Sequence, residues 1–205
     1  MEPVNDTYRT IIQPSEETLY KEKGSKFYGY CFPVTTESEV HEHIEKLKKQ
    51  HHNARHHCYA YQIGVQTMQY RANDDGEPSG TAGLPIYGQI QSFEVTNILV
   101  VIVRYFGGTK LGVGGLITAY KESARMALES CEIIEKTIDE EFLLTFDYKD
   151  MNGVMRIIKE QHIAIKKQEA AENCRMRISV RKNKVAEILR AFEALYEVKI
   201  SPFEN

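Results

Sequence analysis

The stretch NILVVIVRYFGGTKLGVGGLITAY, residues 97–120, decides the fold of the first half of the chain. Its opening, NILVVIV, is apolar on both alternating faces, which is typical of a strand in the middle of a sheet covered on both sides. Five glycines follow, and apolar side chains then return at helical spacing, at Ile117, Tyr120, Ala124 and Ala127. The stretch therefore predicts a central strand, a glycine-rich turn and a helix with one buried face.

Alternating strands and helices are expected before this stretch. ETLYKE and SKFYGYCF predict a hairpin, and Thr36 with Glu39 predicts a capping box that opens a helix. A strand at residues 57–65, its return partner QYRAN and a short helix at residues 85–92 complete the pattern. We therefore expect residues 1–137 to form one domain that mixes strands and helices.

The pattern restarts at residue 139. Segments with strand and helix periodicity follow in the order strand, helix, strand, strand, helix, strand within about sixty residues, which is the order of a ferredoxin-like domain. The sequence thus predicts an α+β protein whose second domain covers residues 138–205.

Composition narrows the class of protein. The net charge of -3 argues against a general polyanion binder, so no DNA is expected and any RNA contact must be local. No apolar run is long enough to cross a membrane and the N-terminus resembles no export signal, so we expect a cytoplasmic protein. Four cysteines lie apart without metal-ligand spacing, which predicts free thiols.

The glycine-rich turn is the first candidate for a binding site. A turn between a strand and a helix N-terminus offers free N–H groups and a positive dipole to an anion. GGTKLGVGG matches neither the nucleoside triphosphatase motif nor the dinucleotide-binding motif. The alternative is structural, because glycines also permit positive φ and close packing.

The segment RANDDGEPSGTAG, residues 71–83, is the second candidate. Its three close carboxylates could bind a metal ion, yet the calcium-loop pattern is absent and the same residues are typical of turns. We therefore expect neither a metal nor a cofactor.

We expect the two loops to converge on one polar site. Arg104 and Lys110, with the N–H groups at the start of the helix, would form one wall of this site. The other wall would be formed by His57 and by DDGEPSGTAG, residues 74–83, which we call the acidic loop. The predicted anion- or ligand-binding residues are His57, Asp74, Asp75, Glu77, Arg104, Gly107, Gly108, Lys110, Gly112, Gly114, Gly115 and Tyr120.

A cationic strand in the second domain is the third candidate. In CRMRISVRK, apolar and cationic residues alternate, so one face would present Arg175, Arg177 and Arg181. An open sheet face of this kind can bind RNA. The alternative is a solvated face balanced by Glu141 and Asp147.

ARHHCYAY (54–61), DDGEPSGTAG (74–83) and RYFGGTKLGVGGLITAY (104–120) together resemble the IMPACT family, also called the YigZ-like or UPF0029 family. GSKF (24–27) resembles the family's early element, and the second half resembles the C-terminal domain of the bacterial two-domain type. The resemblance implies a first domain of the ribosomal protein S5 domain 2-like fold. It implies a ferredoxin-like second domain similar to domain V of elongation factor G.

The resemblance also implies a function in translation, because these folds occur side by side in elongation factor G and eukaryotic IMPACT proteins regulate translation. We expect a regulator that binds RNA, the ribosome, a translation factor or a regulatory protein. The alternative is an enzyme or binding protein for a phosphorylated small molecule, and a pure protein-interaction module stays open. No nucleophile–base pair stands at a defined spacing, and the sequence does not decide whether the protein is an enzyme.

Overall fold

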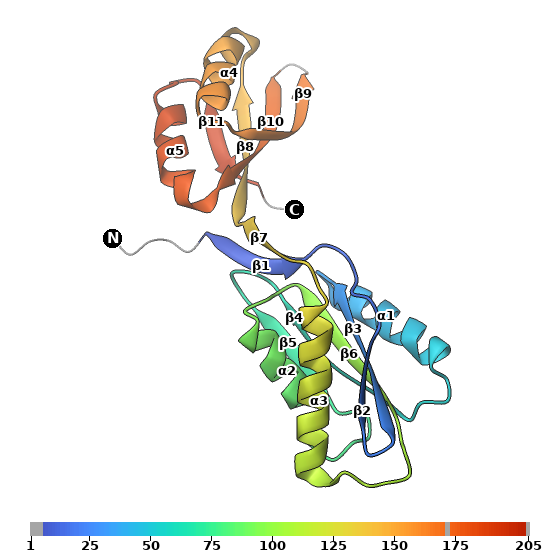
Figure 1. Cartoon of the computed structure of the whole chain (residues 1–205). Coiled ribbons are helices and arrows are strands. Elements are labelled where there is room, and N and C mark those ends of the chain that lie inside the picture. The colour runs from blue at the N-terminus through green and yellow to red at the C-terminus, as the bar shows by residue number, and fades with distance from the viewer. Residues whose placement is uncertain (1–5, 171–172, 204–205) are drawn as a thin grey trace. The chain divides into compact units, whose positions relative to one another are not determined.

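The computed structural model describes residues 6–170 and 173–203, which form two compact units (Figure 1). One unit is Tyr8–Lys136, and the other contains the chain from Thr137 onward together with residues 6 and 7. Both units mix strands and helices. Within the described ranges, every helix is too short or too polar to span a bilayer.

A five-stranded sheet forms the centre of the first unit. Its order is β2-β3-β6-β4-β5, with β2 Thr18–Glu22, β3 Ser25–Pro33, β4 His56–Ile63, β5 Gln69–Asn73 and β6 Ile98–Tyr105. Residues 98–103 of β6 are fully buried, because both faces of the central strand are covered. The prediction of a central strand is confirmed.

Helices cover both faces of this sheet (Figure 1). Helix α1, Glu37–Gln50, packs on one face, and α2, Gly83–Ser92, and α3, Gly112–Glu129, pack on the other. The capping box of Thr36 and Glu39 is confirmed at the start of α1. The predicted buried face of α3 is wrong at Ile117, which is 38% exposed, whereas the neighbouring Leu116 is buried.

A separate two-stranded sheet joins β1, Thr7–Ile11, to β7, Ile133–Thr137. These strands lie at the two ends of the first unit's sequence. The pairing therefore ties the beginning of that unit to its end.

The second unit has the predicted element order. It contains β8 Asp139–Phe146, α4 Met151–Glu160, β9 Ala164–Ala170, β10 Cys174–Arg181, α5 Val185–Glu193 and β11 Lys199–Pro202. The strands form an antiparallel sheet in the order β11-β8-β10-β9. Apolar residues of β8 and β10 pack with those of α4 and α5 in one core, so the helices share one face of the sheet.

Candidate functional site

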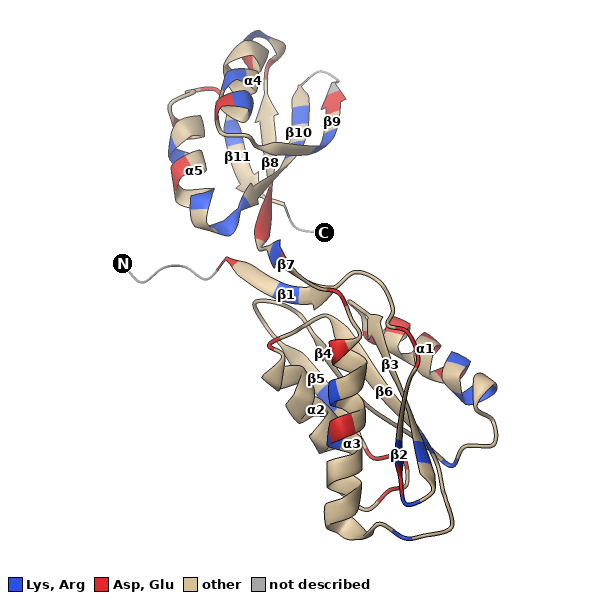
Figure 2. Cartoon of the chain, in the orientation of Figure 1, with Lys and Arg blue, Asp and Glu red and all other residues tan. Residues whose placement is uncertain are grey.

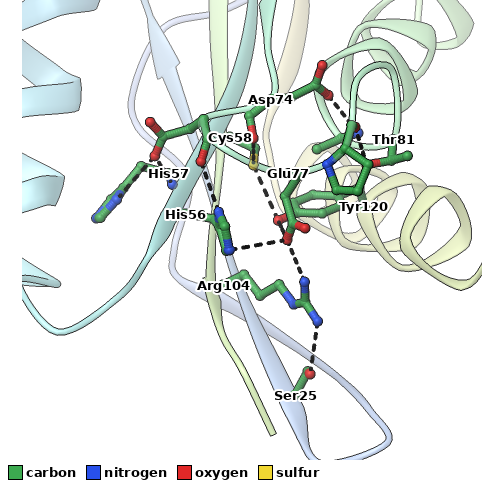
Figure 3. A network of polar contacts seen from close by, with 12 residues as sticks. Ser25, His56, His57, Cys58, Asp74, Glu77, Thr81, Arg104 and Tyr120 are labelled. Atoms are coloured by element: carbon green, nitrogen blue, oxygen red, sulfur yellow. Dashed lines mark hydrogen bonds and ion pairs between the residues drawn. The ribbon is translucent and has the colours of Figure 1, made fainter. Parts of the chain in front are cut away.

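Glu77 lies at the centre of a buried polar cluster in the first unit (Figure 3). One of its carboxylate oxygens, Oε1, accepts hydrogen bonds from Arg104 Nη1 at 2.5 Å and from the Tyr120 hydroxyl at 2.8 Å. His56 Nε2 lies 3.9 Å from the same oxygen. We call this group the signature cluster; its members are Ser25, His56, Cys58, Asp74, Glu77, Arg104 and Tyr120.

Strand register explains why Arg104 points into the cluster. On the sheet, Arg104 stands directly between Phe27 of β3 and His56 of β4, and paired residues share a face. The guanidinium carbon lies 5.4 Å from the centroid of the Phe27 ring, a cation–π contact. Its Nη2 lies 3.5 Å from the Ser25 hydroxyl. Arg104 is thus held by side chains of β3 and of the acidic loop.

Asp74 gives the acidic loop its shape. Its carboxylate accepts hydrogen bonds from the backbone N–H groups of Gly80, Ala82 and Gly83, at 2.8–2.9 Å. These bonds cap the N-terminus of α2, whose own N-cap residue has no side-chain bond. Partial burial raises the pKa of Asp74, but the three N–H groups outweigh it and lower the pKa below its ordinary value.

The two histidines at the start of β4, His56 and His57, lie on opposite faces of the sheet. Side chains alternate along β4, so His56 faces Glu77, whereas His57 pairs with Val103 on the face packed against α1. Burial lowers the pKa of His57 below its ordinary value. Its backbone N–H still donates to Asp75 Oδ2 at 2.6 Å. His57 Nδ1 lies 3.8 Å from the same Asp75 oxygen, so His57 adjoins the acidic loop, whereas the histidine that faces Glu77 is His56.

Cys58 was missed at the sequence level because a lone buried cysteine carries no motif. The thiol lies 3.0 Å from the Asp74 carbonyl oxygen and 3.3 Å from the Tyr120 hydroxyl. Burial raises the pKa of the Cys58 thiol and of the Tyr120 hydroxyl well above their ordinary values. Both groups therefore stay protonated at neutral pH, and Cys58 is a poor nucleophile.

The glycine-rich stretch divides into a closely packed anchor and an exposed tip. Gly107 belongs to the anchor: a Cβ there would lie 1.8 Å from the carbonyl carbon of Gly24 in the β2–β3 turn. Residues 108–114, which we call the glycine tip, include an exposed Lys110 and a Val113 that is 59% exposed. A Cβ at Gly114 would meet nothing within 4 Å. Packing inside the protein therefore does not require glycine at position 114.

The structure also revises the predicted wall of the anion site. Arg104 is 5% exposed and its guanidinium is paired with Glu77, so it does not offer its charge to a ligand beside Lys110. The glycine tip keeps the other predicted donors: α3 starts without a side-chain cap, and its first turn holds no acidic residue. Gly108 and Gly112 have positive φ, whereas Gly115 is half-buried beside Leu111.

The three arginines of the predicted cationic strand have different surroundings in the second unit. Arg177 is paired with Glu141 at 3.3 Å and lies over the Phe203 ring at 4.7 Å from its centroid. Arg181 is paired with Asp6. Arg175 is exposed and borders a hollow of about 220 Å³ floored by Leu143 and Phe203. Acidic neighbours thus balance much of the positive charge of this face.

The sequence of the first unit matches a known family. Residues 23–128, which contain the whole signature cluster, match the family described as the Impact N-terminal domain. The chain belongs to the IMPACT family.

Individual relatives come from bacteria and mammals. The chain is 38% identical over 167 residues to "IMPACT family member YvyE" of Bacillus subtilis, covering 82% of this chain and 76% of that protein. It is 34% identical over 146 residues to "IMPACT family member YigZ" of Escherichia coli, covering 70% and 72%. Human "Protein IMPACT" is 32% identical over 96 residues, which span 44% of this chain and 29% of the human protein.

A solved structure resembles the whole chain. It is titled "Crystal structure of an hypothetical protein" and is 27% identical, with a TM-score of 0.71. The likeness covers 98% of this chain and 100% of the other. The fold of this chain is therefore shared with a protein of solved structure.

Proposed function

We propose that this protein is a translation-associated regulator that acts by binding, and that the glycine tip contacts RNA of the ribosome. Membership of the IMPACT family supports a role of this type, since the family resemblance implies regulation of translation. Binding of a translation factor or regulatory protein is the competing form of the same proposal.

The observation that carries the proposal is the division between the signature cluster and the glycine tip. The cluster is closed: Glu77 is paired with Arg104, Asp74 caps α2, and Cys58 stays protonated. The cluster joins β6, α3 and the acidic loop, and it offers no activated nucleophile. The tip beyond it is exposed and uses glycine at position 114, where the fold does not need it. A glycine of this kind lets the backbone of a partner approach closely.

The charges around the glycine tip favour a phosphate-bearing partner. Lys110 in the tip, Lys23 in the β2–β3 turn and Lys26 at the start of β3 are exposed, and within residues 6–170 and 173–203 none has an acidic partner within 4.0 Å. Figure 2 shows lysine and arginine positions on the β2–β3 hairpin and on the loop that follows β6. Together with the uncapped start of α3, they suit the RNA backbone.

The finer fold assignments are part of the proposal. The strand order β11-β8-β10-β9 with two helices on one face supports a ferredoxin-like second domain, for residues 138–205. For residues 1–137 we propose the ribosomal protein S5 domain 2-like fold. In the second unit, Arg175 beside Phe203 offers a further contact for RNA.

Co-sedimentation with purified ribosomes across a salt series tests the proposal. The wild-type protein is expected to sediment with ribosomes at low salt and to dissociate as salt rises. Lys110→Glu should weaken sedimentation, because it reverses a charge in the tip. Lys121→Glu makes the same change at an exposed position of α3 outside the tip and should bind as the wild type does. Absence of sedimentation at every salt concentration would refute ribosome binding.

The uncapped start of α3 favours one alternative, a phosphorylated small molecule bound at the glycine tip. In that case simple phosphate esters would raise the melting temperature of the wild type but not of Lys110→Glu. Such stabilisation, without ribosome binding, would replace the translation proposal with a small-molecule one.

A further inference from the structure

A cleft of about 500 Å³ lies beside the β2–β3 turn and the end of β6. It adjoins the signature cluster at Phe106, whose ring centroid lies 5.7 Å from the guanidinium carbon of Arg104. It is on the α1 face of the sheet, because Lys26 and Tyr105 pair there and side chains alternate from Arg104 to Tyr105. Its lining residues are Glu17, Gly24, Lys26, Tyr28, His51, Tyr105 and Phe106. Gly24 also touches Gly107, so the cleft and the glycine tip adjoin through the β2–β3 turn.

Aromatic rings dominate this cleft. Tyr28 and Tyr105 meet edge to face, with centroids 5.8 Å apart and an interplanar angle of 82°. The His51 ring lies 5.5 Å from Tyr28, and Phe106 is 51% exposed at the rim. An exposed phenylalanine next to two half-buried tyrosines offers a flat ligand a surface on which to stack.

A chain of hydrogen bonds fixes what Tyr105 can offer to a ligand. The Tyr30 hydroxyl donates its only proton to the Glu17 carboxylate, so His51 Nε2, 2.6 Å away, must donate to the Tyr30 oxygen. His51 Nδ1 then accepts from the Tyr105 hydroxyl at 3.0 Å. Burial lowers the pKa of His51, in keeping with a neutral ring that carries one proton. The Tyr105 oxygen is left as a hydrogen-bond acceptor at the cleft.

The charges in the cleft favour an anion. Glu17 already accepts the Tyr30 proton, whereas Lys26 has no acidic partner within 4.0 Å in the part of the chain that the structure describes. The cleft thus combines a ring-stacking surface, an acceptor for an N–H group and an available ammonium group. A nucleotide combines a flat base with N–H donors and a phosphate.

We propose that the cleft binds one unpaired nucleotide of single-stranded RNA. The base stacks on Phe106 and the tyrosines, its N–H donates to the Tyr105 oxygen, and Lys26 meets its phosphate, while the neighbouring phosphate follows the glycine tip. A volume of 500 Å³ lies within the ordinary range for small-ligand sites. Duplex RNA does not fit, because its bases are stacked on each other. This inference rests on the proposed function and names the form of RNA.

Binding of a fluorescein-labelled octauridylate to the full chain, followed by anisotropy, tests the cleft. Loss of one base–aromatic stack predicts about 5- to 150-fold weaker binding for Phe106→Ala. Tyr105→Phe, which removes the acceptor and keeps the ring, should also weaken binding. Lys26→Ala should lower the slope of log K against log salt by about 0.7.

Matched controls separate the cleft from general surface effects. Tyr70→Ala removes an aromatic ring that is 59% exposed and stacked on Tyr87. Tyr70 lies on β5, the edge strand on the opposite side of the sheet from β2. Lys121→Ala removes a lysine from the exposed side of α3. Both variants should bind octauridylate as the wild type does. Cross-linking of a 4-thiouridine oligomer should map to Tyr28, Tyr105 or Phe106.

The outcomes distinguish failure of the cleft from failure of the proposed function. Ribosome binding that is lost in Lys110→Glu but kept in Phe106→Ala, with no octauridylate binding by the wild type, overturns the cleft and leaves the proposed function standing. Equal affinity for duplex and single strand, or cross-links that map only to the Arg175–Arg181 strand, also overturns it. If Phe106→Ala loses binding of a translation factor and the wild type binds no RNA, the cleft binds a protein instead of RNA.

Discussion

At the scale of single residues, Glu77 contributes most to the site, because one carboxylate oxygen joins β6, α3 and the acidic loop. Glu77 and Arg104 side chains are 4% and 6% exposed, respectively. A buried pair of this kind is costly to form and more costly to break, since the remaining charge has no partner.

Replacing Glu77 with glutamine should therefore destabilise the protein strongly. Glu77→Gln keeps the shape but leaves the Arg104 charge without a counterion, and we expect a loss of about 3–5 kcal/mol in the free energy of unfolding. Urea denaturation followed by circular dichroism measures it. The exposed Glu132→Gln is the control, with less than about 0.5 kcal/mol expected. Equal stability of the two variants would mean that the ion pair contributes nothing to the fold.

Asp74→Asn should change the pH dependence of stability. The carboxylate loses its charge, and the amide NH₂ would face one of the backbone donors, at an expected cost of about 1–2 kcal/mol at neutral pH. Because the folded pKa of Asp74 is lowered, its stabilisation is present above the unfolded pKa of ~3.9 and is lost as pH falls through the folded value. Thermal denaturation from pH 7 to pH 2.5 should show the two proteins converging at acid pH. A constant difference would contradict this assignment.

At the scale of elements, the turn between β6 and α3 contains glycines with opposite roles. Gly107 packs against the β2–β3 turn with no room for a side chain, whereas Gly114 lies in the first turn of α3 in open space. Packing therefore requires glycine at position 107 and does not require it at position 114.

Alanine substitutions at these two glycines form a matched pair. Gly107→Ala forces the β2–β3 turn to move and should lower the melting temperature or abolish folding. Gly114→Ala should keep or raise stability, by up to about 1 kcal/mol, because alanine favours a helix. It should still weaken ribosome binding, which co-sedimentation measures. A folded Gly107→Ala protein of unchanged stability would contradict the packing role.

Sequence reasoning predicted the elements better than the directions of side chains. The burial of β6 follows from a run that is apolar on both faces, and the α1 capping box follows from Thr36 and Glu39. The sequence did not separate His56 from His57, because a shift of one residue moves a strand side chain to the other face. The pairing of Arg104 with Glu77 depends on contacts between distant segments, which spacing along the chain does not specify.

At the scale of the whole molecule, the two compact units have separate hydrophobic cores. We predict that a protein ending at Thr137 folds cooperatively, because it keeps the five-stranded sheet, its three helices and the β1–β7 pair. Thermal denaturation of the truncated protein and limited proteolysis of the full chain test whether the first unit folds independently. A truncated protein without a cooperative transition would show that the first unit requires the second.

The position of β6 has a consequence for synthesis of the chain. Residues 26–33 of β3 pair with β6, although β6 lies ~70 residues later in the sequence. A ribosome adds these residues in about 4–14 s. Until then β3 has only its hairpin with β2, and an isolated hairpin is marginally stable in water. Its aromatic side chains, Phe27, Tyr28, Tyr30 and Phe32, therefore stay exposed to solvent on every nascent chain. Nascent chains released before β6 is made are the species of this protein that chaperones must keep from aggregating.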